Sequence, residues 1–330
     1  MKRLVIALSI MASSASYATV NSDSIFGYSV EQDIVYGQGA VRPEGEHGEI
    51  EMRDLLMDVY HPANIESDEP LPVVVYVHGG GHHRGDKFMP GFRVGDAIHT
   101  APQEYGRMFA AEGYVTFVPE YRLATEWPET DHMPGEANLH ADLDLYVDDV
   151  MLAGVSRART SLGLSTPEGQ EGKLTLWKGG MSGAEDVVKT INHIIENAEQ
   201  YNIDPERIAI GGHSAGGGIA ANVAFGFKAP VVAAFPMSAP EIAFDASVMD
   251  SDIPPTLLTY SQFDDHAMLV HAPRMVKLLE RSGVDFSVNW VPGFMHSYPG
   301  NAISLASDGT RMPLFDRIVA FLDENVKNAK

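Results

Sequence analysis

The sequence predicts an α/β protein in which a mostly parallel sheet is covered by helices on both faces. Two observations carry this prediction. Short apolar runs at residues 73–77 and 114–118 have the length and composition of buried strands, and residues 207–210 are expected to form another strand. Segments with apolar side chains at helical spacing, such as residues 185–201, alternate with these runs. Such alternation is typical of parallel strands joined by crossover helices.

The other expected elements continue the same alternation. Residues 54–60 alternate apolar and polar side chains and are followed by Pro62, which predicts an edge strand. Further strands are expected at residues 231–235, 256–260 and 286–291, and further helices at residues 105–111, 274–282 and 314–326, with one more helix ending at Phe225.

Residues 130–183 interrupt the alternation, because they separate a predicted strand from the helix expected to cover it. They contain an acidic helical segment at residues 140–157 and a glycine-rich end. Connections of this length commonly carry function. A lid and a solvated surface excursion agree equally well with the sequence. The whole of residues 19–330 is expected to form a single domain.

Composition excludes several classes of protein. The chain has 330 residues, no cysteine and a formal net charge of -22 at pH 7. So acidic a surface repels nucleic-acid phosphates and anionic lipids, so neither is an expected partner. The absence of cysteine excludes disulfides, thiolate metal sites and cysteine nucleophiles. The oligomeric state is left open.

The first 18 residues have the three parts of a secretory signal peptide. Lys2 and Arg3 precede an apolar run at residues 4–11, and a small-x-small cleavage site ends at Ala18. The run is too short to span a bilayer, and no later stretch is long and apolar enough. We therefore expect cleavage after Ala18 and an exported, soluble mature protein, located in a bacterial periplasm or the medium.

The strongest chemical signal is Gly212-His213-Ser214-Ala215-Gly216, between a predicted strand and a predicted helix. In that context G-x-S-x-G predicts a nucleophile elbow, a sharp turn that lifts a serine hydroxyl above the sheet. The start of the following helix supplies the Ala215 N–H and the positive end of a dipole. An ordinary glycine-rich turn is the alternative.

A second signal is His78-Gly79-Gly80-Gly81, directly after the strand at residues 73–77. Consecutive glycines allow backbone N–H groups to point into a cavity, where they can stabilise the oxyanion of acyl transfer. A phosphate-binding loop would need a lysine-serine pair next, and none follows. An oxyanion hole takes donors from both loops, so the two motifs support one another.

A nucleophilic serine needs a base and a carboxylate that orients the base. In chain order, an acid and then a histidine are expected after strand ends downstream of the serine. Asp264 and Asp265 follow the strand at residues 256–260, and His296 follows the strand at residues 286–291. We favour Asp264 because it lies at S-x-x-D spacing from Ser261, although the sequence does not decide cleanly between the two carboxylates.

These motifs resemble those of α/β-hydrolases of the HGGG type, that is, hormone-sensitive-lipase-like carboxylesterases and bacterial feruloyl-esterase-like hydrolases. The resemblance covers residues 55–325 and is carried by five segments: residues 78–81 (HGGG), 121–124 (YRLA), 202–208 (NIDPERI), 212–217 (GHSAGG) and 293–296 (GFMH).

The resemblance implies a Ser214, Asp264 and His296 triad and an oxyanion hole built from the N–H groups of Gly80, Gly81 and Ala215. The chain departs from the family pattern at His82, at residues 125–127 and throughout residues 130–183. His213 is more typical of the feruloyl-esterase-like and arylformamidase-like branches. These departures leave the substrate open but not the reaction class.

The sequence therefore predicts an exported serine esterase that acts on a small-molecule ester, with short acyl groups implied by the resemblance. No cofactor or metal is expected. The same constellation cleaves amides in arylformamidases and prolyl-peptidase relatives, so amide hydrolysis is the first alternative. The second is a catalytically silent binding protein, because a fold alone does not prove activity.

Overall fold

The protein is described by a computed structural model. It covers residues 27–63, 65, 69–136, 138–161, 163–164, 166, 168–240, 242–245 and 253–328. The predicted signal peptide at residues 1–18 lies outside the described residues.

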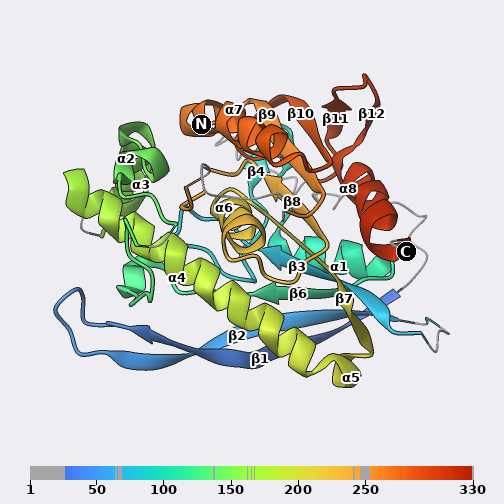
Figure 1. Cartoon of the computed structure of the whole chain (residues 1–330), viewed down its shortest axis with the longest axis horizontal. Coiled ribbons are helices and arrows are strands. Elements are labelled where there is room, and N and C mark those ends of the chain that lie inside the picture. Colours follow the sequence, from blue (N-terminus) through green and yellow to red (C-terminus); the bar gives the residue numbers. More distant parts are fainter. Residues whose placement is uncertain are drawn as a thin grey trace, which may run out of the picture.

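The described residues form a ten-stranded sheet in the order β1-β2-β6-β3-β7-β8-β9-β10-β11-β12 (Figure 1). The strands are β1 (Gly27–Val41), β2 (Glu51–Ala63), β3 (Leu71–Val77), β6 (Val115–Pro119), β7 (Ile203–His213), β8 (Ala233–Met237), β9 (Thr256–Phe263), β10 (Phe286–Met295), β11 (Ile303–Ala306) and β12 (Arg311–Pro313). Strands β6 to β10 in this order pair in parallel, and antiparallel strands flank them at both edges. A short hairpin of β4 (Arg93–Val94) and β5 (Ala97–Ile98) lies outside this sheet.

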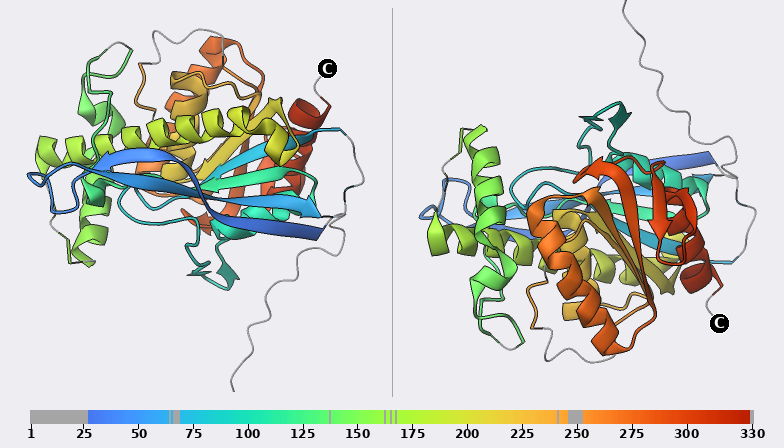
Figure 2. Two further views of the ribbon diagram at one scale, coloured as in Figure 1. Left: turned by 90° about the horizontal axis from the view of Figure 1, so that it is seen from below. Right: turned by 90° about the horizontal axis from the view of Figure 1, so that it is seen from above.

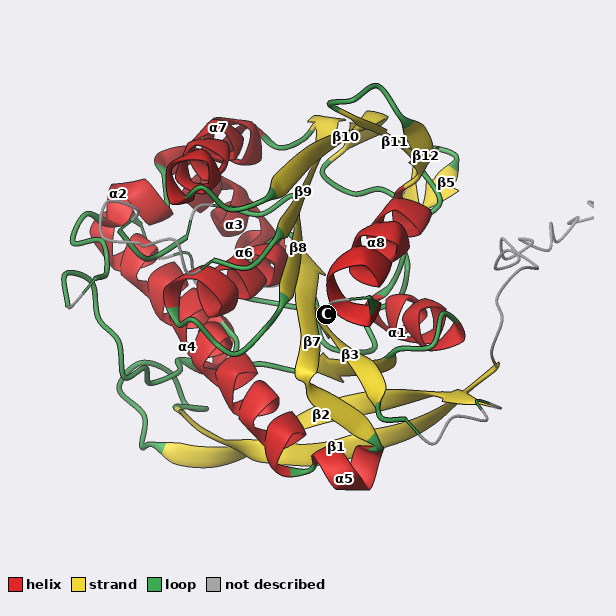
Figure 3. Ribbon diagram, turned by 45° about the vertical axis from the view of Figure 1, so that its right-hand side comes forward, coloured by secondary structure: helices red, strands yellow, loops and turns green. Residues whose placement is uncertain are grey.

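Helices cover both faces of the sheet (Figures 2 and 3). One face carries α1 (Pro102–Ala111) and α8 (Leu314–Leu322), whose apolar side chains form one core with the sheet. The other carries α4 (Gly169–Glu196), α6 (Ala215–Ala221) and α7 (His266–Ser282), which form the second core. Shorter helices are α2 (Leu143–Tyr146), α3 (Asp149–Ser161) and α5 (Ala198–Tyr201), together with the 3-10 helix η1 (Ala124–Glu126) and the π-helical segments η2 (Asn222–Gly226) and η3 (Asp323–Lys327). The predicted fold class is confirmed.

The order of the strands in the sheet indicates where a ligand site is expected. From β3 the chain crosses to β6 on one side and then returns to β7 on the other side of β3. Ligands of open α/β sheets bind at the carboxyl ends of the strands, where such a reversal occurs. The HGGG segment follows β3 and the G-x-S-x-G segment continues from β7, so the topology brings them together.

Three sequence expectations about single elements are wrong. The strand predicted at residues 54–60 is not an edge strand, because β1 pairs along it from Gly27 to Val41. The helix predicted to begin at residue 185 begins at Gly169. The acidic helix predicted at residues 140–157 is instead the two helices α2 and α3.

A buried ion pair joins the segment after β6 to α4. The Arg122 guanidinium donates to both Asp186 oxygens, with Nη2–Oδ1 and Nε–Oδ2 distances of 2.8 Å, and both side chains are buried. Although burial opposes its charge, the hydrogen bonds that Arg122 donates to Asp186 and the charges of Asp186 and Glu185 raise the pKa of Arg122. This pair therefore fixes the segment after β6, in which the Ala124 N–H donates to the His82 carbonyl oxygen, next to the predicted oxyanion loop.

We expect Asp186→Ala to lower the free energy of unfolding by about 3–5 kcal/mol, because it removes the carboxylate closest to a buried guanidinium and leaves only the longer contact with Glu185. Urea unfolding followed by circular dichroism measures this loss. The matched control is Glu104→Ala, which breaks the exposed pair with Arg107 and is expected to cost less than about 1 kcal/mol. Equal losses in the two variants would contradict the structural role of Asp186.

Candidate active site

Ser214 lies at the turn between β7 and α6. Its backbone has φ 59° and ψ -123°, a strained conformation for a residue other than glycine. Glycines on both sides allow this turn to approach β3. A Cβ at Gly216 would lie 2.1 Å from the Val77 carbonyl oxygen, and one at Gly212 would lie 2.4 Å from the same atom. The G-x-S-x-G segment therefore has the geometry expected of a nucleophile elbow.

The structure brings the three predicted side chains into one chain of hydrogen bonds. His296 Nε2 lies 2.7 Å from Ser214 Oγ, and His296 Nδ1 lies 2.6 Å from Asp264 Oδ1. Asp264 follows β9 and His296 follows β10, and these parallel strands pair as far as Met295 and Phe263. The carboxyl ends of three parallel strands thus bring together the three side chains that the sequence predicts as nucleophile, base and orienting acid.

Asp264, and not its exposed neighbour Asp265, is the carboxylate against His296. Its oxygens also accept from the backbone N–H of Ser261 and of Asp265, and from the Ser238 hydroxyl. Burial opposes its charge, but the hydrogen bond and charge of His296, followed by the other donors, lower the pKa of Asp264 to about 2. The carboxylate therefore stays ionised at neutral pH.

We expect kcat/KM to fall on the acid side of its pH profile (the acid limb) with a midpoint above pH 6.5, which is the ordinary pKa of histidine. Burial alone would lower the pKa of His296, but its hydrogen bond to Asp264 and the charges of Asp264 and Asp265 raise it. A general base must be neutral, so activity is lost as the pH falls through this raised pKa. Hydrolysis of a p-nitrophenyl ester, followed at the isosbestic wavelength of the product, measures the limb. An acid limb below pH 6 would contradict His296 as the base.

The glycine loop after β3 touches the elbow. A Cβ at Gly79 would lie 3.3 Å from the Ser214 Cβ, so the backbones of the two turns lie close together. Gly80 and Gly81 have φ 127° and 64°, and a Cβ at Gly80 would lie 1.9 Å from the Arg84 carbonyl oxygen. Ala215 is the first residue of α6, where N–H groups have no acceptor within the helix. The roles of these three N–H groups remain predictions that this arrangement accommodates.

Two side chains that the sequence analysis left without a role support this loop. The His78 and Tyr121 rings stack with centroids 4.2 Å apart, and the Tyr121 hydroxyl donates to the His78 carbonyl oxygen. His78 Nδ1 lies 2.8 Å from the Gly79 carbonyl oxygen. Burial lowers the pKa of His78 to about 4, so its ring is neutral at physiological pH. The first residue of the HGGG motif is thus a support for the glycines.

Residues 130–183 lie beside this loop. They form α2, α3 and the first half of α4, and α3 also contacts α7. The Val155 side chain of α3 would lie 3.7 Å from a Cβ placed on Gly81. The excursion therefore borders the predicted oxyanion loop on one side, which is the placement that a lid or a wall of the substrate site requires.

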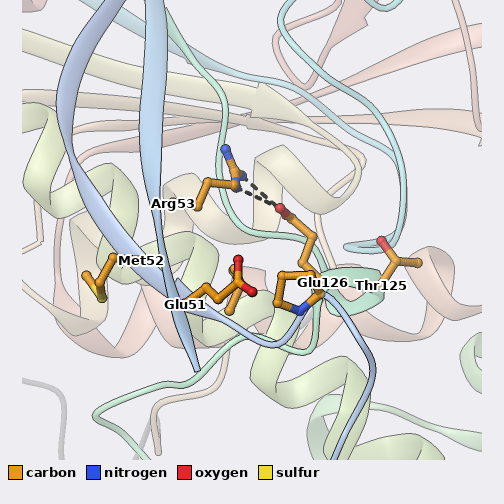
Figure 4. A pocket seen from close by; sticks show the side chains of 7 residues that line it. Glu51, Met52, Arg53, Thr125 and Glu126 are labelled. Atoms are coloured by element: carbon orange, nitrogen blue, oxygen red, sulfur yellow. Dashed lines mark hydrogen bonds and ion pairs between the residues drawn. The ribbon is translucent and has the colours of Figure 1, made fainter. Parts of the chain in front are cut away.

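A separate hollow of about 450 Å³ lies at the end of β1, the start of β2 and η1 (Figure 4). Arg53 and Glu126 form an ion pair there, with an Nε–Oε1 distance of 2.6 Å. The strand ends that carry Ser214, Asp264 and His296 take no part in its lining. We assign this hollow no part in the chemistry.

Comparisons with known proteins agree with the geometry. A family model described as "alpha/beta hydrolase fold" matches residues 182–247, and a model described as "BD-FAE" matches residues 57–134. The chain has the α/β-hydrolase fold. The two matched segments contain the elbow and the HGGG loop, so the resemblance to HGGG-type carboxylesterases predicted from the sequence is confirmed. A search of curated proteins finds no match.

Solved structures of this α/β-hydrolase fold align over most of the chain. A truncated carbohydrate esterase from gut microbiota is 15% identical, with a TM-score of 0.55, and the match covers 93% of this chain and 99% of the other. The α/β-hydrolase enzyme MGS-M1, from a Medee basin deep-sea metagenome library, is 15% identical (TM-score 0.54; 91% and 99% covered). Thermogutta terrifontis esterase 2, phosphorylated by paraoxon, is 14% identical (TM-score 0.53; 91% and 93% covered).

Two further findings concern the described part of this chain. None of its helices combines the length and the apolar character needed to cross a membrane. No group of three or more histidine, aspartate or glutamate side chains there is arranged to hold a metal ion.

Proposed function

We propose that this chain is a serine hydrolase that cleaves carboxylic esters, with short acyl groups as its preferred substrates. The observation that carries the proposal is the hydrogen-bonded chain from Ser214 through His296 to Asp264 at the elbow, directly beside the glycine loop. The matches to esterase structures support the choice of esters.

The proposed reaction has two halves. Ser214 Oγ attacks the ester carbonyl carbon while His296 Nε2 takes the hydroxyl proton. The N–H groups of Gly80, Gly81 and Ala215 stabilise the resulting oxyanion. When the intermediate collapses, the ester C–O bond breaks and His296 returns the proton to the departing alcohol. Water then attacks the acyl-enzyme while His296 takes its proton, the bond between the acyl carbon and Ser214 Oγ breaks to release the acid, and His296 returns the proton to Ser214 Oγ.

Asp264 serves both halves by remaining ionised. It accepts a hydrogen bond from Nδ1–H of His296 at 2.6 Å, which fixes the tautomer with Nε2 free to receive the serine proton. Its negative charge stabilises the imidazolium that forms during each attack. The side chain of His296 is one-fifth exposed (21%), so part of the imidazole is in contact with solvent.

A substrate panel tests the proposal. We expect the highest kcat/KM for p-nitrophenyl acetate or butyrate, lower values for methyl ferulate, and little turnover of an insoluble long-chain ester. If an aryl formamide or a dipeptide amide were hydrolysed faster than every ester, the protein would be an amidase and the assignment as an esterase would be wrong. A folded protein that neither hydrolyses the panel nor reacts with a fluorophosphonate probe would be a silent binding protein.

We also propose that residues 1–18 are removed on export to the periplasm or the medium, on the basis of the charged, apolar and small-residue parts of this segment. N-terminal sequencing of the protein recovered from a bacterial host tests this. We expect a chain that begins at Thr19. An intact Met1 in a chain confined to the cytoplasmic fraction would contradict it.

A further inference from the structure

A buried serine lies on the far side of the Asp264 carboxylate from His296. Ser238 Oγ is 2.5 Å from Asp264 Oδ2 and 2.9 Å from the Tyr298 hydroxyl, and both Ser238 and Tyr298 are fully buried. An ionised carboxylate only accepts hydrogen bonds, so the Ser238 hydroxyl donates to Asp264. The Ser238 oxygen is then left to accept from Tyr298.

Tyr298 stays protonated and is therefore able to act as that donor. Burial, followed by the negative charge of Asp264, raises its pKa well above the ordinary value of 10. The hydrogen bonds thus run in one direction, from the Tyr298 hydroxyl to Ser238 and on to Asp264. Donors arranged in series polarise one another, which strengthens the last bond, the one to the carboxylate.

The backbone at Ser238 is strained. The residue follows β8 with φ 45°, in the left-handed region that favours glycine. Its N–H donates to the Thr259 carbonyl oxygen of β9 at 2.7 Å, which holds the backbone in place. Strain of this kind persists where the surrounding structure imposes it, and it is concentrated at functional sites. Here the strained residue is the one whose hydroxyl meets the acid of the triad.

Tyr298 also belongs to the segment that carries His296. Its carbonyl oxygen lies 2.9 Å from His99 Nδ1, and its ring packs edge-on against His213 at 5.3 Å. His213 Nε2 in turn lies 2.7 Å from the His296 carbonyl oxygen. The base and its orienting acid are therefore tied together twice, directly through Nδ1 and indirectly through Tyr298 and Ser238.

We propose that Ser238, oriented by Tyr298, is a positioning residue that holds Oδ2 of Asp264 so that Oδ1 stays on Nδ1 of His296. The inference rests on the proposed serine-hydrolase function. The backbone N–H groups of Ser261 and Asp265 give each carboxylate oxygen one donor. Ser238 adds a side-chain donor on the oxygen that His296 does not use, which opposes rotation of the carboxylate away from the imidazole.

Two substitutions at one position separate positioning from stability. Ser238→Ala and Ser238→Gly both remove the hydroxyl, but only glycine relieves the strain at φ 45°. We expect kcat to fall about tenfold in both variants, with KM within about twofold of the wild-type value, although glycine gives the more stable protein. Tyr298→Phe, which leaves the Ser238 hydroxyl without its donor, is expected to show a smaller loss of kcat.

The pKa of His296 is a readout that a purely structural role would not move, and NMR titration of its ring needs no substrate. The hydrogen bond from Nδ1 to Asp264 Oδ1 raises the pKa of His296, and the proposed role of Ser238 is to hold that bond. Removal of the Ser238 hydroxyl is therefore expected to lower the pKa of His296 and to move the acid limb of kcat/KM to lower pH. The matched control is Ser182→Ala, which removes a buried serine hydroxyl in α4 and is expected to change neither quantity.

The outcomes are distinct. A wild-type protein that hydrolyses no ester removes the proposed function, whereas the NMR titration still tests the contact of Ser238 with the acid. An active wild-type protein whose Ser238→Ala and Ser238→Gly variants keep kcat within twofold, or whose His296 pKa is unchanged in both, overturns the positioning role. A loss in the alanine variant that glycine reverses also overturns it, because activity would then follow strain and not the hydroxyl.

Discussion

Ser214→Ala is expected to lower kcat by about 10⁴-fold or more while the protein remains folded. The substitution removes the only atom that forms the proposed covalent bond to the acyl group. Alanine keeps the Cβ of serine and adopts the same backbone at φ 59°, so little stability is lost. The measurement is ester hydrolysis at saturating substrate, together with labelling by a fluorophosphonate probe, which is expected to disappear.

A double variant makes this test sharper. Because the triad acts as a unit, Ser214→Ala combined with His296→Ala is expected to be no slower than Ser214→Ala alone. The amount by which this residual rate exceeds the rate in buffer then measures the contribution of the glycine loop and of substrate binding to catalysis. If Ser214→Ala retained a tenth of the wild-type rate, the reaction would take place elsewhere in the molecule, and the proposed function would fail.

The positions of Ser214 and His296 in the structure could be predicted from the sequence because their signals are local. A buried strand followed by G-x-S-x-G specifies both the backbone turn at Ser214 and its place at the carboxyl edge of the sheet. His296 follows the last parallel strand in the same way. The choice of Asp264 depended on its spacing from Ser261, and the structure gives that spacing a cause: the Ser261 N–H donates to Asp264 Oδ2 at 3.1 Å.

The early start of α4 could not be predicted, because packing outweighs the low helix propensity of glycine there. A Cβ at Gly180 would lie 2.1 Å from the Tyr146 hydroxyl, and one at Gly179 would lie 2.8 Å from the Ala124 Cβ. Only glycine allows α2 and η1 to approach the helix so closely. A glycine-rich segment that resembles a loop in the sequence is therefore the contact surface of a long helix.

Strand β1 was missed for a different reason. Its pairing with β2 shifts register between Glu31 and Ile34 and again between Val35 and Gly37. Each irregularity reverses the face to which later side chains point, so the alternation on which sequence analysis depends is lost. The first half of β1 is also exposed, which leaves no apolar pattern to detect.

The contacts of Ser238 and Tyr298 had no signal in the sequence at all. Ser238 lies 26 residues before Asp264, and Tyr298 lies 60 residues after Ser238. Neither belongs to a motif, and both acquire a role only because β8, β9 and β10 are neighbours in the sheet. Side chains that act through another residue are fixed by tertiary contacts, so they are the part of a site that local patterns do not contain.

Asp264→Asn is expected to lower kcat by about 10³- to 10⁴-fold, with little change in fold. An asparagine amide keeps the size of the carboxylate and can face His296 in two ways. Either its NH₂ group donates toward Nδ1, or its uncharged carbonyl oxygen accepts from Nδ1–H. The first arrangement favours the tautomer that carries its proton on Nε2, which cannot accept the Ser214 proton, and both remove the charge that stabilises the imidazolium. The pKa of His296 is expected to fall, since Asp264 raises it.

Asp265→Asn is the matched control, because it makes the same change one residue along the chain. The Asp265 side chain is exposed, and its hydrogen bond to Asp264 is made by the backbone N–H, which the substitution leaves in place. The side chain acts on His296 through its negative charge, which raises the pKa of His296. We expect kcat within about threefold of the wild-type value and an acid limb slightly lower than in the wild type. Steady-state kinetics across pH compares the two variants. If Asp265→Asn were the more damaged enzyme, the acid of the triad would have to be reassigned, since the hydrogen bond between Asp264 and His296 would then not be the one that supports catalysis.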